Sequence, residues 1–589
     1  MLCYNGDMKI TLATIAVAAT SLAAVNELNW NIETYEPRTP VMTGSVASGF
    51  HGSVTPMTRV NARTINSLTD ANRSWKGVAW RNERINAQFA LWTRESAEQV
   101  RVKISDFLAP DGAKIPASAC RSRFVRYVFS SQVDLKGRIV HSEELIGDCL
   151  DTAERVDMPE KGYRPFWFTM DVPADAKPGE YSGTVTAIAQ GGRKVEFAVT
   201  VEVQNRTLAA PKDWKFFLDL WQHPLAVARY HGVKPWSKDH FSMLKPLLQE
   251  LASIGQKTIT ATLTDHPWNH QNFDAYHTMV EHIKGADGKF THDYRIFDDW
   301  VEFAQSCGLG PQIHCYTMVT WGNIVHYVDG VTGDKVAVKL VPGTPEHEEF
   351  WGPFLVDFEK HLKAKGWLGR TYIAIDERSR DELLASAAVL NKYAPAIKIQ
   401  MAGNKPPSTF KGIEIQNYSQ SMRASWVSPE FKEEVKVRRE KGYVTTTYIC
   451  CSPPRPNTFT FSQYAEQQWL ALYTAAQGFD GMLRWAVFNW PRDPFFDTAF
   501  NPHFGSWALG DTFLVYPGPR LSVRWENLRD SIENFEKIRM LRESGASTPE
   551  LEEALSQIDY TKEAANGDES YFASRVKAVT DAISAASAK

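Results

Sequence analysis

The chain has 589 residues, a formal net charge of -4, 12% aromatic residues and 19 tryptophans. This length exceeds one typical hydrophobic core and predicts two or three domains. The near-neutral charge and the lack of a basic run argue against a nucleic-acid-binding protein. The many tryptophans hint at carbohydrate binding, because indole faces stack on sugar rings, although tryptophans also fill cores.

Residues 1–24 are predicted to be a secretory signal peptide. Lys9 precedes the apolar run Ile10–Ala19, and the small residues within 21–23 provide a cleavage site. The run is too short to span a bilayer, and no other segment of the sequence is apolar enough. We therefore expect a secreted protein of the periplasm with no membrane span. The alternative for this segment is a buried N-terminal helix.

Residues 25–210 are predicted to form a β-sandwich. Short apolar or alternating runs, such as 124–129 and 166–172, are separated by Pro, Gly and Asp and show almost no helical periodicity. Cys120 and Cys149 are the candidate pair for a disulfide in an oxidising compartment. The other cysteines of the mature chain are expected to be buried thiols. They are Cys307, Cys315, Cys450 and Cys451.

Residues 211–520 are predicted to form a (β/α)8 barrel, because strands and amphipathic helices alternate there. The eight strands are expected near 214–220, 256–263, 311–318, 370–376, 396–402, 412–417, 443–450 and 478–485. The fifth crossover, between Met401 and Gly412, is too short for a full helix. Either the barrel is irregular there or the neighbouring strand is misplaced. Residues 521–589 are strongly helical and are expected to pack on the barrel.

The C-terminal ends of the strands form the active site in this kind of barrel. Polar and aromatic residues collect at the predicted ends, as a sugar pocket requires. They are Trp221, His223, His266, Trp268, Tyr316, Asp376, Glu377, Asn417, Tyr418, Tyr448, Arg484, Trp485, Asn489 and Trp490. For any single Tyr or Trp, packing is as good an explanation as ligand binding, so the accumulation at one end carries the inference.

Two adjacent carboxylates, Asp376 and Glu377, stand directly after the apolar run Thr371–Ile375. Two carboxyl groups with separated pKa values can divide acid catalysis from electrostatic stabilisation at one sugar. The alternative is a helix N-cap with acidic residues in the first turn.

Other chemistries have little support in the sequence. The histidines at the strand ends lack the spacing of metal ligands, so no metal is expected. No Gly-rich dinucleotide or phosphate loop precedes a helix, and no Gly-x-Ser-x-Gly elbow follows a strand. We therefore expect no cofactor.

Four motifs occur in a fixed order along the barrel and beyond it. They are Asp376-Glu377, the segment 448–458, the segment 481–494 and the segment 510–530. Together they resemble glycoside hydrolase family 123. The strand around Trp167 and the turn at 178–183 also look like the leading β-sandwich of that family, so the resemblance covers nearly the whole mature chain.

The resemblance implies a retaining β-N-acetylgalactosaminidase that uses substrate-assisted catalysis. In such enzymes the 2-acetamido oxygen of the sugar is the nucleophile and forms an oxazolinium-type intermediate. Carried onto this chain, Glu377 would be the general acid/base, and Asp376 would orient the acetamido group and stabilise its developing positive charge. Sequence neighbours cannot easily flank an anomeric carbon from opposite faces, but they can serve two neighbouring atoms of one sugar.

Substrate contacts are expected from further strand-end residues. The Tyr448 hydroxyl is the candidate donor to the acetamido carbonyl, and Trp485 and Trp490 are candidates for the pocket wall. Tyr316, Asn417, Tyr418 and Arg484 complete the predicted substrate-binding set. The expected partner is a glycan or glycolipid with a terminal N-acetylhexosamine. The alternatives are a β-N-acetylglucosaminidase or broad hexosaminidase, and a non-catalytic carbohydrate-binding protein; the intact Asp-Glu pair argues against the last.

Overall fold

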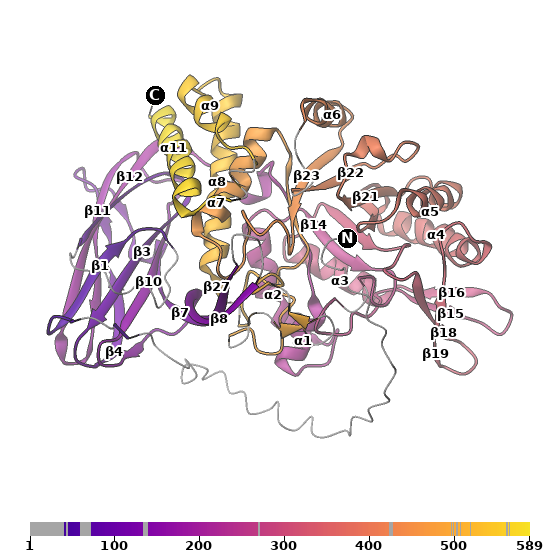
Figure 1. The fold of residues 1–589 in the computed structure, drawn as a ribbon, viewed down its shortest axis with the longest axis horizontal. Coiled ribbons are helices and arrows are strands. Elements are labelled where there is room, and N and C mark those ends of the chain that lie inside the picture. The colour runs from indigo at the N-terminus through magenta and orange to yellow at the C-terminus, as the bar shows by residue number, and fades with distance from the viewer. Residues whose placement is uncertain are drawn as a thin grey trace.

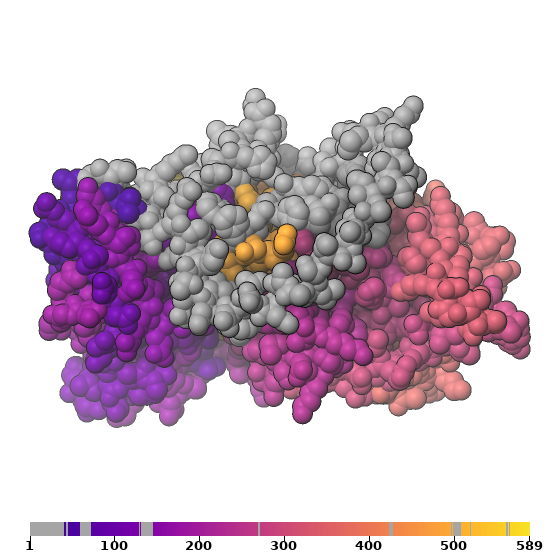
Figure 2. Space-filling view, turned by 90° about the horizontal axis from the view of Figure 1, so that it is seen from below, coloured from indigo at the N-terminus to yellow at the C-terminus, as the bar shows by residue number. Residues whose placement is uncertain are grey.

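The computed structural model places a β-sandwich at one end of the molecule and a parallel barrel at the other, with C-terminal helices between them (Figure 1). One face seen in Figure 2 likewise has the sandwich at one end and barrel segments at the other. The structure describes residues 41–588 except 43–44, 59–71, 134–138, 269–270, 423–427, 496–497, 499, 502–504, 507, 519, 561–563 and 565. The predicted signal peptide therefore lies outside the described residues.

The N-terminal region consists of two packed sheets. One has the strand order β1-β3-β10-β7-β8-β27, and the other has the order β2-β12-β11-β4-β9, with β5 and β6 attached at β11. The strands are β1 Phe50–Thr55, β2 Ser74–Arg81, β3 Arg84–Thr93, β4 Ala97–Ile104, β5 Phe107–Leu108, β6 Lys114–Ile115, β7 Cys120–Val133, β8 Ile139–Leu150, β9 Val156–Met158, β10 Tyr163–Asp171, β11 Gly179–Ile188, β12 Lys194–Thr207 and β27 Leu521–Ser522. Phe89 of one sheet meets Phe197 of the other, with ring centroids 4.8 Å apart. The predicted sandwich is confirmed.

Eight parallel strands form the barrel in the order β13-β24-β23-β22-β21-β20-β17-β14. They are β13 Phe217–Leu220, β14 Thr258–Thr262, β17 Gln312–Tyr316, β20 Thr371–Ile375, β21 Lys398–Gly403, β22 Asn417–Ser421, β23 Val444–Ile449 and β24 Gly481–Arg484. The ring is nearly closed, because Leu218 bridges Gln256 just before β14, and the Lys257 amide donates to the Leu218 carbonyl. The predicted (β/α)8 barrel is confirmed.

Helices cover the barrel and continue beyond it. They are α1 Pro224–His231, α2 Lys238–Ser253, α3 Arg295–Ser306, α4 Pro345–Lys365, α5 Arg380–Tyr393, α6 Pro429–Glu440, α7 Tyr464–Gln477, α8 Val523–Glu543, α9 Pro549–Ser556 and α11 Glu569–Ser587. The C-terminal helices α8 and α11 pack on α7 of the barrel, and they also contact sandwich strands. Among the described residues, no helix combines the length and apolar character needed to cross a bilayer.

The sixth barrel strand differs from the prediction. It was expected at 412–417, but β22 begins at Asn417. The alternating residues before it look like a strand in sequence, yet the Ile415 carbonyl accepts a hydrogen bond from the Arg438 side chain and not from a neighbouring strand. The expected irregularity of the fifth crossover is confirmed, since only the 3-10 turn Pro407–Thr409 lies between β21 and β22.

Loop insertions form a second small sheet that the sequence did not predict. Its order is β16-β15-β18-β19, with β15 Glu281–Lys284, β16 Phe290–Asp293, β18 Ile324–Asp329 and β19 Lys335–Lys339. The first two strands follow β14 and the last two follow β17. The insertions therefore extend the C-terminal ends of two neighbouring barrel strands. A short ribbon, β25 Phe500–Asn501 with β26 Gly505–Ser506, follows β24.

The candidate disulfide between Cys120 and Cys149 is wrong. Both residues are free thiols. Cys149 on β8 pairs with Arg126 of β7, whereas Cys120 begins β7 and pairs with Met170. Six residues of extended strand separate Cys120 from Arg126, which is about 20 Å and far beyond the reach of a disulfide.

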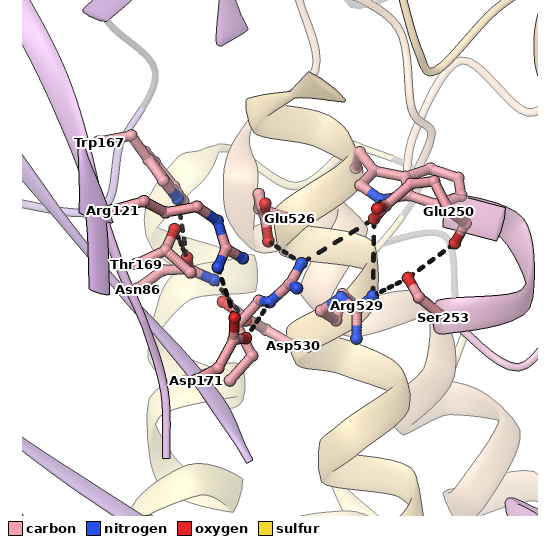
Figure 3. Close-up of polar contacts among 12 residues, drawn as sticks. Asn86, Arg121, Trp167, Thr169, Asp171, Glu250, Ser253, Glu526, Arg529 and Asp530 are labelled. Atoms are coloured by element: carbon pink, nitrogen blue, oxygen red, sulfur yellow. Dashed lines mark hydrogen bonds and ion pairs between the residues drawn. The ribbon is translucent and has the colours of Figure 1, made fainter. Parts of the chain in front are cut away.

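A buried polar network joins α8 to the sandwich and to α2 (Figure 3). Glu526 is fully buried and pairs with Arg123 at 3.2 Å and with Arg84 at 3.5 Å. The Asp530 carboxylate accepts a hydrogen bond of 2.9 Å from the Asn86 amide. The Asn86 carbonyl in turn accepts a hydrogen bond from Trp167. Charged groups buried in this way must keep their partners, so the network fixes how α8 sits against the sheet.

Asp530 also lines a cavity of about 370 Å³ between the sandwich and the C-terminal helices. Burial, together with the nearby negative charge of Glu526, raises the pKa of Asp530 to about 8. An aspartate in an unfolded chain has a pKa of about 3.9. The folded protein therefore retains a proton that the unfolded chain releases. The resulting stabilisation is fully present below about pH 4 and is lost as the pH rises through 8.

We expect Asp530→Asn to flatten this pH dependence, because an amide cannot ionise while its oxygen still accepts from Asn86. Between pH 5 and 9 the variant should lose about 2 kcal/mol less unfolding free energy than the wild type. This figure is below the full effect of the pKa shift, because Asp530 keeps some solvent exposure. Urea unfolding at a series of pH values measures the difference. Asp381→Asn, on a fully exposed carboxylate, is the control, and parallel pH profiles for Asp530→Asn and wild type would contradict the expectation.

Candidate active site

Asp376 and Glu377 follow β20 directly and precede α5. All five residues of β20 are buried, which fixes the backbone from which the two carboxylates project. The N-cap of α5 is Ser379, whose side chain accepts from the Glu382 amide in a capping box. Ser379 and Glu382, which both follow the carboxylate pair in the chain, thus cap the start of α5. Asp376 and Glu377 are not the N-cap and first-turn acids of the alternative interpretation.

Glu377 accepts a hydrogen bond from the Tyr448 hydroxyl. Tyr448 is the penultimate residue of β23 and is 4% exposed. Burial, reinforced by the negative charge of Glu377, raises the pKa of Tyr448 well above its usual value. The phenol therefore stays protonated and acts as a fixed donor to the carboxylate.

Asp376 has a different partner. The indole N–H of Trp321 donates to Asp376 Oδ2 at 2.9 Å. The guanidinium of Arg378 lies 4.1 Å from the centre of the Trp321 ring and donates to the Glu377 carbonyl at 2.7 Å. Each carboxylate is therefore oriented by its own aromatic donor. Trp321 was not predicted as a site residue from the sequence. The available signal was its position, five residues after the end of β17.

Aromatic side chains surround the pair on neighbouring strand ends. Tyr316 at the end of β17 packs against Trp221 with ring centroids 4.5 Å apart, and Trp221 stacks on Trp268 at 5.1 Å. Tyr448, Trp321 and Trp485 belong to the same cluster. The indole N–H groups of Trp221 and Trp268 are buried and have no hydrogen-bond partner among the described residues. An unpaired buried donor costs free energy, so these two N–H groups are available to a polar ligand.

His223 lies at the edge of this cluster, 5.8 Å from Trp268 and 6.3 Å from Trp485 between ring centroids. Burial lowers the pKa of His223 to about 3, so its imidazole is neutral at ordinary pH. A neutral imidazole can bind a hydroxyl group without adding charge beside the carboxylates. Within the described parts of the chain, no group of three or more His, Cys, Asp or Glu is placed to hold a metal ion.

Three of the predicted substrate-binding residues, Tyr316, Tyr448 and Trp485, lie together with the carboxylate pair. Arg484 does not join them. Its side chain is fully buried and forms an ion pair of 2.8 Å with Asp511. Asp511 also accepts from the Trp485 indole at 3.3 Å. Arg484 thus holds Asp511, which in turn holds the Trp485 indole.

The other three predicted residues lie elsewhere. Asn417 is the first residue of β22 and donates to Gln312, the first residue of β17, at the opposite end of the barrel from the carboxylates. The Tyr418 hydroxyl donates to the Lys405 carbonyl in the layer outside the strands. Both were placed at a strand end because the sixth strand was expected five residues too early. Trp490 is fully buried against Tyr230 and donates to the Val515 carbonyl at 2.8 Å.

We expect Trp321→Phe to lower kcat about tenfold, because it removes one hydrogen bond to a charged group. The ring remains, so Arg378 keeps its stacking partner. Steady-state kinetics on the proposed substrate measure the effect. Trp300→Phe is the matched control, since it also removes one indole hydrogen bond of 2.9 Å, to the Thr260 carbonyl in the core. Equal kcat values for Trp321→Phe and wild type would refute a role for Trp321 in orienting Asp376.

Two protein-family models match this chain. A family model described as "Glycoside hydrolase 123, catalytic domain" matches residues 221–541, which is more than half of the chain. A second, "Glycoside hydrolase 123 N-terminal domain", matches residues 60–189. No curated protein matches the sequence.

One solved structure supports the fold. A family 123 glycoside hydrolase from Clostridium perfringens, described for glycolipid glycan hydrolysis, matches with a TM-score of 0.83 and 23% identity. The match covers 92% of this chain and 98% of that one. A family 39 glycoside hydrolase from Bacteroides cellulosilyticus matches with a TM-score of only 0.34 at 11% identity, over 77% of this chain and 81% of that one. The Clostridium perfringens enzyme therefore shares the whole fold of this chain, including the sandwich, the barrel and the C-terminal helices.

Proposed function

Because this chain belongs to glycoside hydrolase family 123, we propose that it is a retaining exo-glycosidase that removes terminal β-linked N-acetylgalactosamine from glycans or glycolipids. The observation that carries the proposal is the adjacent pair Asp376 and Glu377, each held by a separate donor, Trp321 and Tyr448. The similar Clostridium perfringens enzyme, described for glycolipid glycan hydrolysis, supports the choice of substrate class.

The spacing of the pair favours participation of the substrate. A conventional retaining enzyme needs a carboxylate nucleophile about 5 Å from the acid and across the sugar ring from it. Asp376 and Glu377 leave the same strand end side by side, so neither is suited to attack from the opposite face. In the proposed mechanism the sugar's own acetamido oxygen attacks the anomeric carbon.

In the first step, Glu377 donates its proton to the glycosidic oxygen as the bond to the aglycone breaks. Asp376 accepts a hydrogen bond from the acetamido N–H and stabilises the positive charge of the oxazolinium that forms. In the second step, the Glu377 carboxylate takes a proton from water, which attacks the anomeric carbon and reopens the ring. Two inversions at that carbon retain the β configuration.

The remaining groups of the site position the reactants. Tyr448 orients the Glu377 carboxyl group through its hydroxyl. From the sequence we expected this hydroxyl to donate to the acetamido carbonyl, which would require Tyr448 to break its hydrogen bond to Glu377. Trp485 is proposed to contact the sugar, with the unpaired N–H groups of Trp221 and Trp268 as donors to hydroxyls. Tyr316 is fully buried and donates to Gln400, so its proposed role is to support Trp221, against which it packs. A secreted, periplasmic location also remains a proposal, and sequencing the N-terminus of the exported protein tests it.

Hydrolysis of aryl β-N-acetylgalactosaminide and aryl β-N-acetylglucosaminide tests the proposal. We expect release from the galacto substrate, with the β-anomer as the first product seen by NMR. Replacing the acetamido group by a trifluoroacetamido group should slow the reaction strongly, because fluorine weakens the nucleophilic oxygen. Equal or faster release from the gluco substrate would favour a hexosaminidase. Binding of the galacto sugar without release from either substrate would favour a carbohydrate-binding protein.

A further inference from the structure

Two neighbouring cysteines lie at the edge of the candidate active site. Cys450 and Cys451 directly follow β23, two and three residues after Tyr448. Their sulfur atoms are 3.9 Å apart, and both side chains are half-buried. A disulfide requires a sulfur separation of about 2 Å, so the two sulfurs need to approach by only about 2 Å to bond.

The other described cysteines are protected from this chemistry. Cys149 and Cys315 are fully buried, and burial raises the pKa of both thiols well above the usual value. Burial also raises the pKa of Cys307, and it raises the pKa of Cys120 to about 12. Thiol oxidation proceeds through the thiolate and needs access to the oxidant. Cys450 and Cys451 are half-buried and their sulfur atoms lie 3.9 Å apart, so a small oxidant can reach them and they can bond to each other.

Cys450 is also part of the site's packing. Its side chain packs against the aromatic cluster that contains Tyr448, Tyr316 and Trp485. Its carbonyl accepts a hydrogen bond of 2.9 Å from the Asn457 side chain, which also holds the Pro453 carbonyl. These hydrogen bonds fix the backbone that follows Cys450. If the Cys450 side chain moves toward Cys451, we therefore expect the aromatic cluster and the end of β23 to shift.

We propose that Cys450 and Cys451 form a dithiol–disulfide redox site that controls the candidate active site. The oxidant is a small-molecule disulfide such as oxidised glutathione. One thiolate attacks it and releases one small thiol; the second cysteine then displaces the other small thiol and forms the Cys450–Cys451 bond. The two cysteines lose two electrons and two protons, and the small disulfide gains both to become two thiols.

The closed form is expected to be easily reduced. Neighbouring Cα atoms are about 3.8 Å apart, which is shorter than the separation across an ordinary disulfide. The resulting strain makes the bond labile, as in regulatory disulfides. Closing the bond draws the Cys450 side chain away from the aromatic cluster and shifts Tyr448, the donor to Glu377. A shift of Tyr448 misplaces the Glu377 carboxyl group that it holds. Misplaced catalytic groups lower turnover, and we expect kcat/KM to fall about tenfold.

Mass spectrometry of the full chain tests the bond directly. The protein is treated with excess oxidised glutathione, blocked with N-ethylmaleimide and digested without reduction. We expect the peptide with Cys450 and Cys451 to have lost two hydrogen atoms and to carry no maleimide, and to take up two maleimides after dithiothreitol. A wild-type peptide that carries two maleimides or two glutathione groups after oxidation would overturn the proposal.

Two variants and a kinetic measurement complete the test. Cys451→Ser cannot close the bond and is expected to lose the redox response, whereas Cys307→Ser should keep it. The kinetic arm rests on the proposed function and compares kcat/KM of the oxidised and reduced forms on the aryl galactosaminide. Closure without a change in kcat/KM would overturn control of the active site. The mass measurement does not depend on turnover, so an inactive protein is not mistaken for a missing redox site.

Discussion

Replacement of Glu377 by glutamine is expected to lower kcat on an alkyl β-N-acetylgalactosaminide by about 10²–10⁴-fold, the usual contribution of a general acid. The amide keeps the shape of the carboxyl group and an oxygen that can still accept from Tyr448. It cannot deliver a proton to the departing oxygen. The substitution thus separates proton transfer from packing.

Leaving-group dependence sharpens this experiment. An aryl glycoside with an acidic phenol needs little protonation, so Glu377→Gln should lose far less activity on it than on an alkyl glycoside. Glu382→Gln is the matched control, because that acid lies in the first turn of α5 only five residues away and glutamine can keep its capping-box bond, so kcat should not change. The same fractional loss on all leaving groups would remove Glu377 from the role of acid.

Replacement of Arg524 by methionine is expected to destabilise the fold by about 3–5 kcal/mol. Arg524 and Asp148 are each 1% exposed, with Nε and Oδ1 2.9 Å apart. The same guanidinium donates to the carbonyls of Thr458, Gly510 and Phe513 at 2.9, 3.0 and 2.7 Å. The substitution leaves a buried carboxylate and three carbonyls without this donor, which is far costlier than losing a surface ion pair.

Denaturant unfolding monitored by tryptophan fluorescence measures the loss. Lys577→Met breaks an exposed ion pair of 2.6 Å with Asp581 on α11 and should change stability by less than about 0.5 kcal/mol. Removing both buried charges with Arg524→Met and Asp148→Leu should restore part of the loss, because no unpaired charge then remains. A loss below about 1 kcal/mol in the single variant would mean that solvent reaches Asp148.

The barrel was predictable because its parallel strands are buried on both faces and stand out as short apolar runs between helices. The prediction failed where this signal was absent. β22 has the polar sequence Asn417-Tyr418-Ser419-Gln420-Ser421, all of it buried, and Asn417 donates across the barrel to Gln312 of β17. The apolar residues just before β22 placed the predicted strand too early in the chain. Asn417 and Tyr418 were therefore wrongly assigned to the strand end that forms the site.

The carboxylate pair itself is a local feature, and the sequence therefore located it. Its supports are not local. Trp321 reaches Asp376 across a separation of 55 residues, and Tyr448 reaches Glu377 across 71. Such contacts depend on the order of strands around the barrel and on loop conformation, and neither is encoded in short-range periodicity. For the same reason, Trp490 and Trp485 look alike in sequence but lie in different environments.

The two-residue strand β27 makes the order of synthesis matter. Leu521 and Ser522 pair with Leu150 and Cys149 of the sandwich, so an N-terminal sheet receives its last strand only after the entire barrel has been made. Until then the edge at β8 is open and can pair with other chains. A gene truncated after the barrel would leave that edge exposed permanently. We therefore expect such fragments to aggregate, although every barrel strand is present in them.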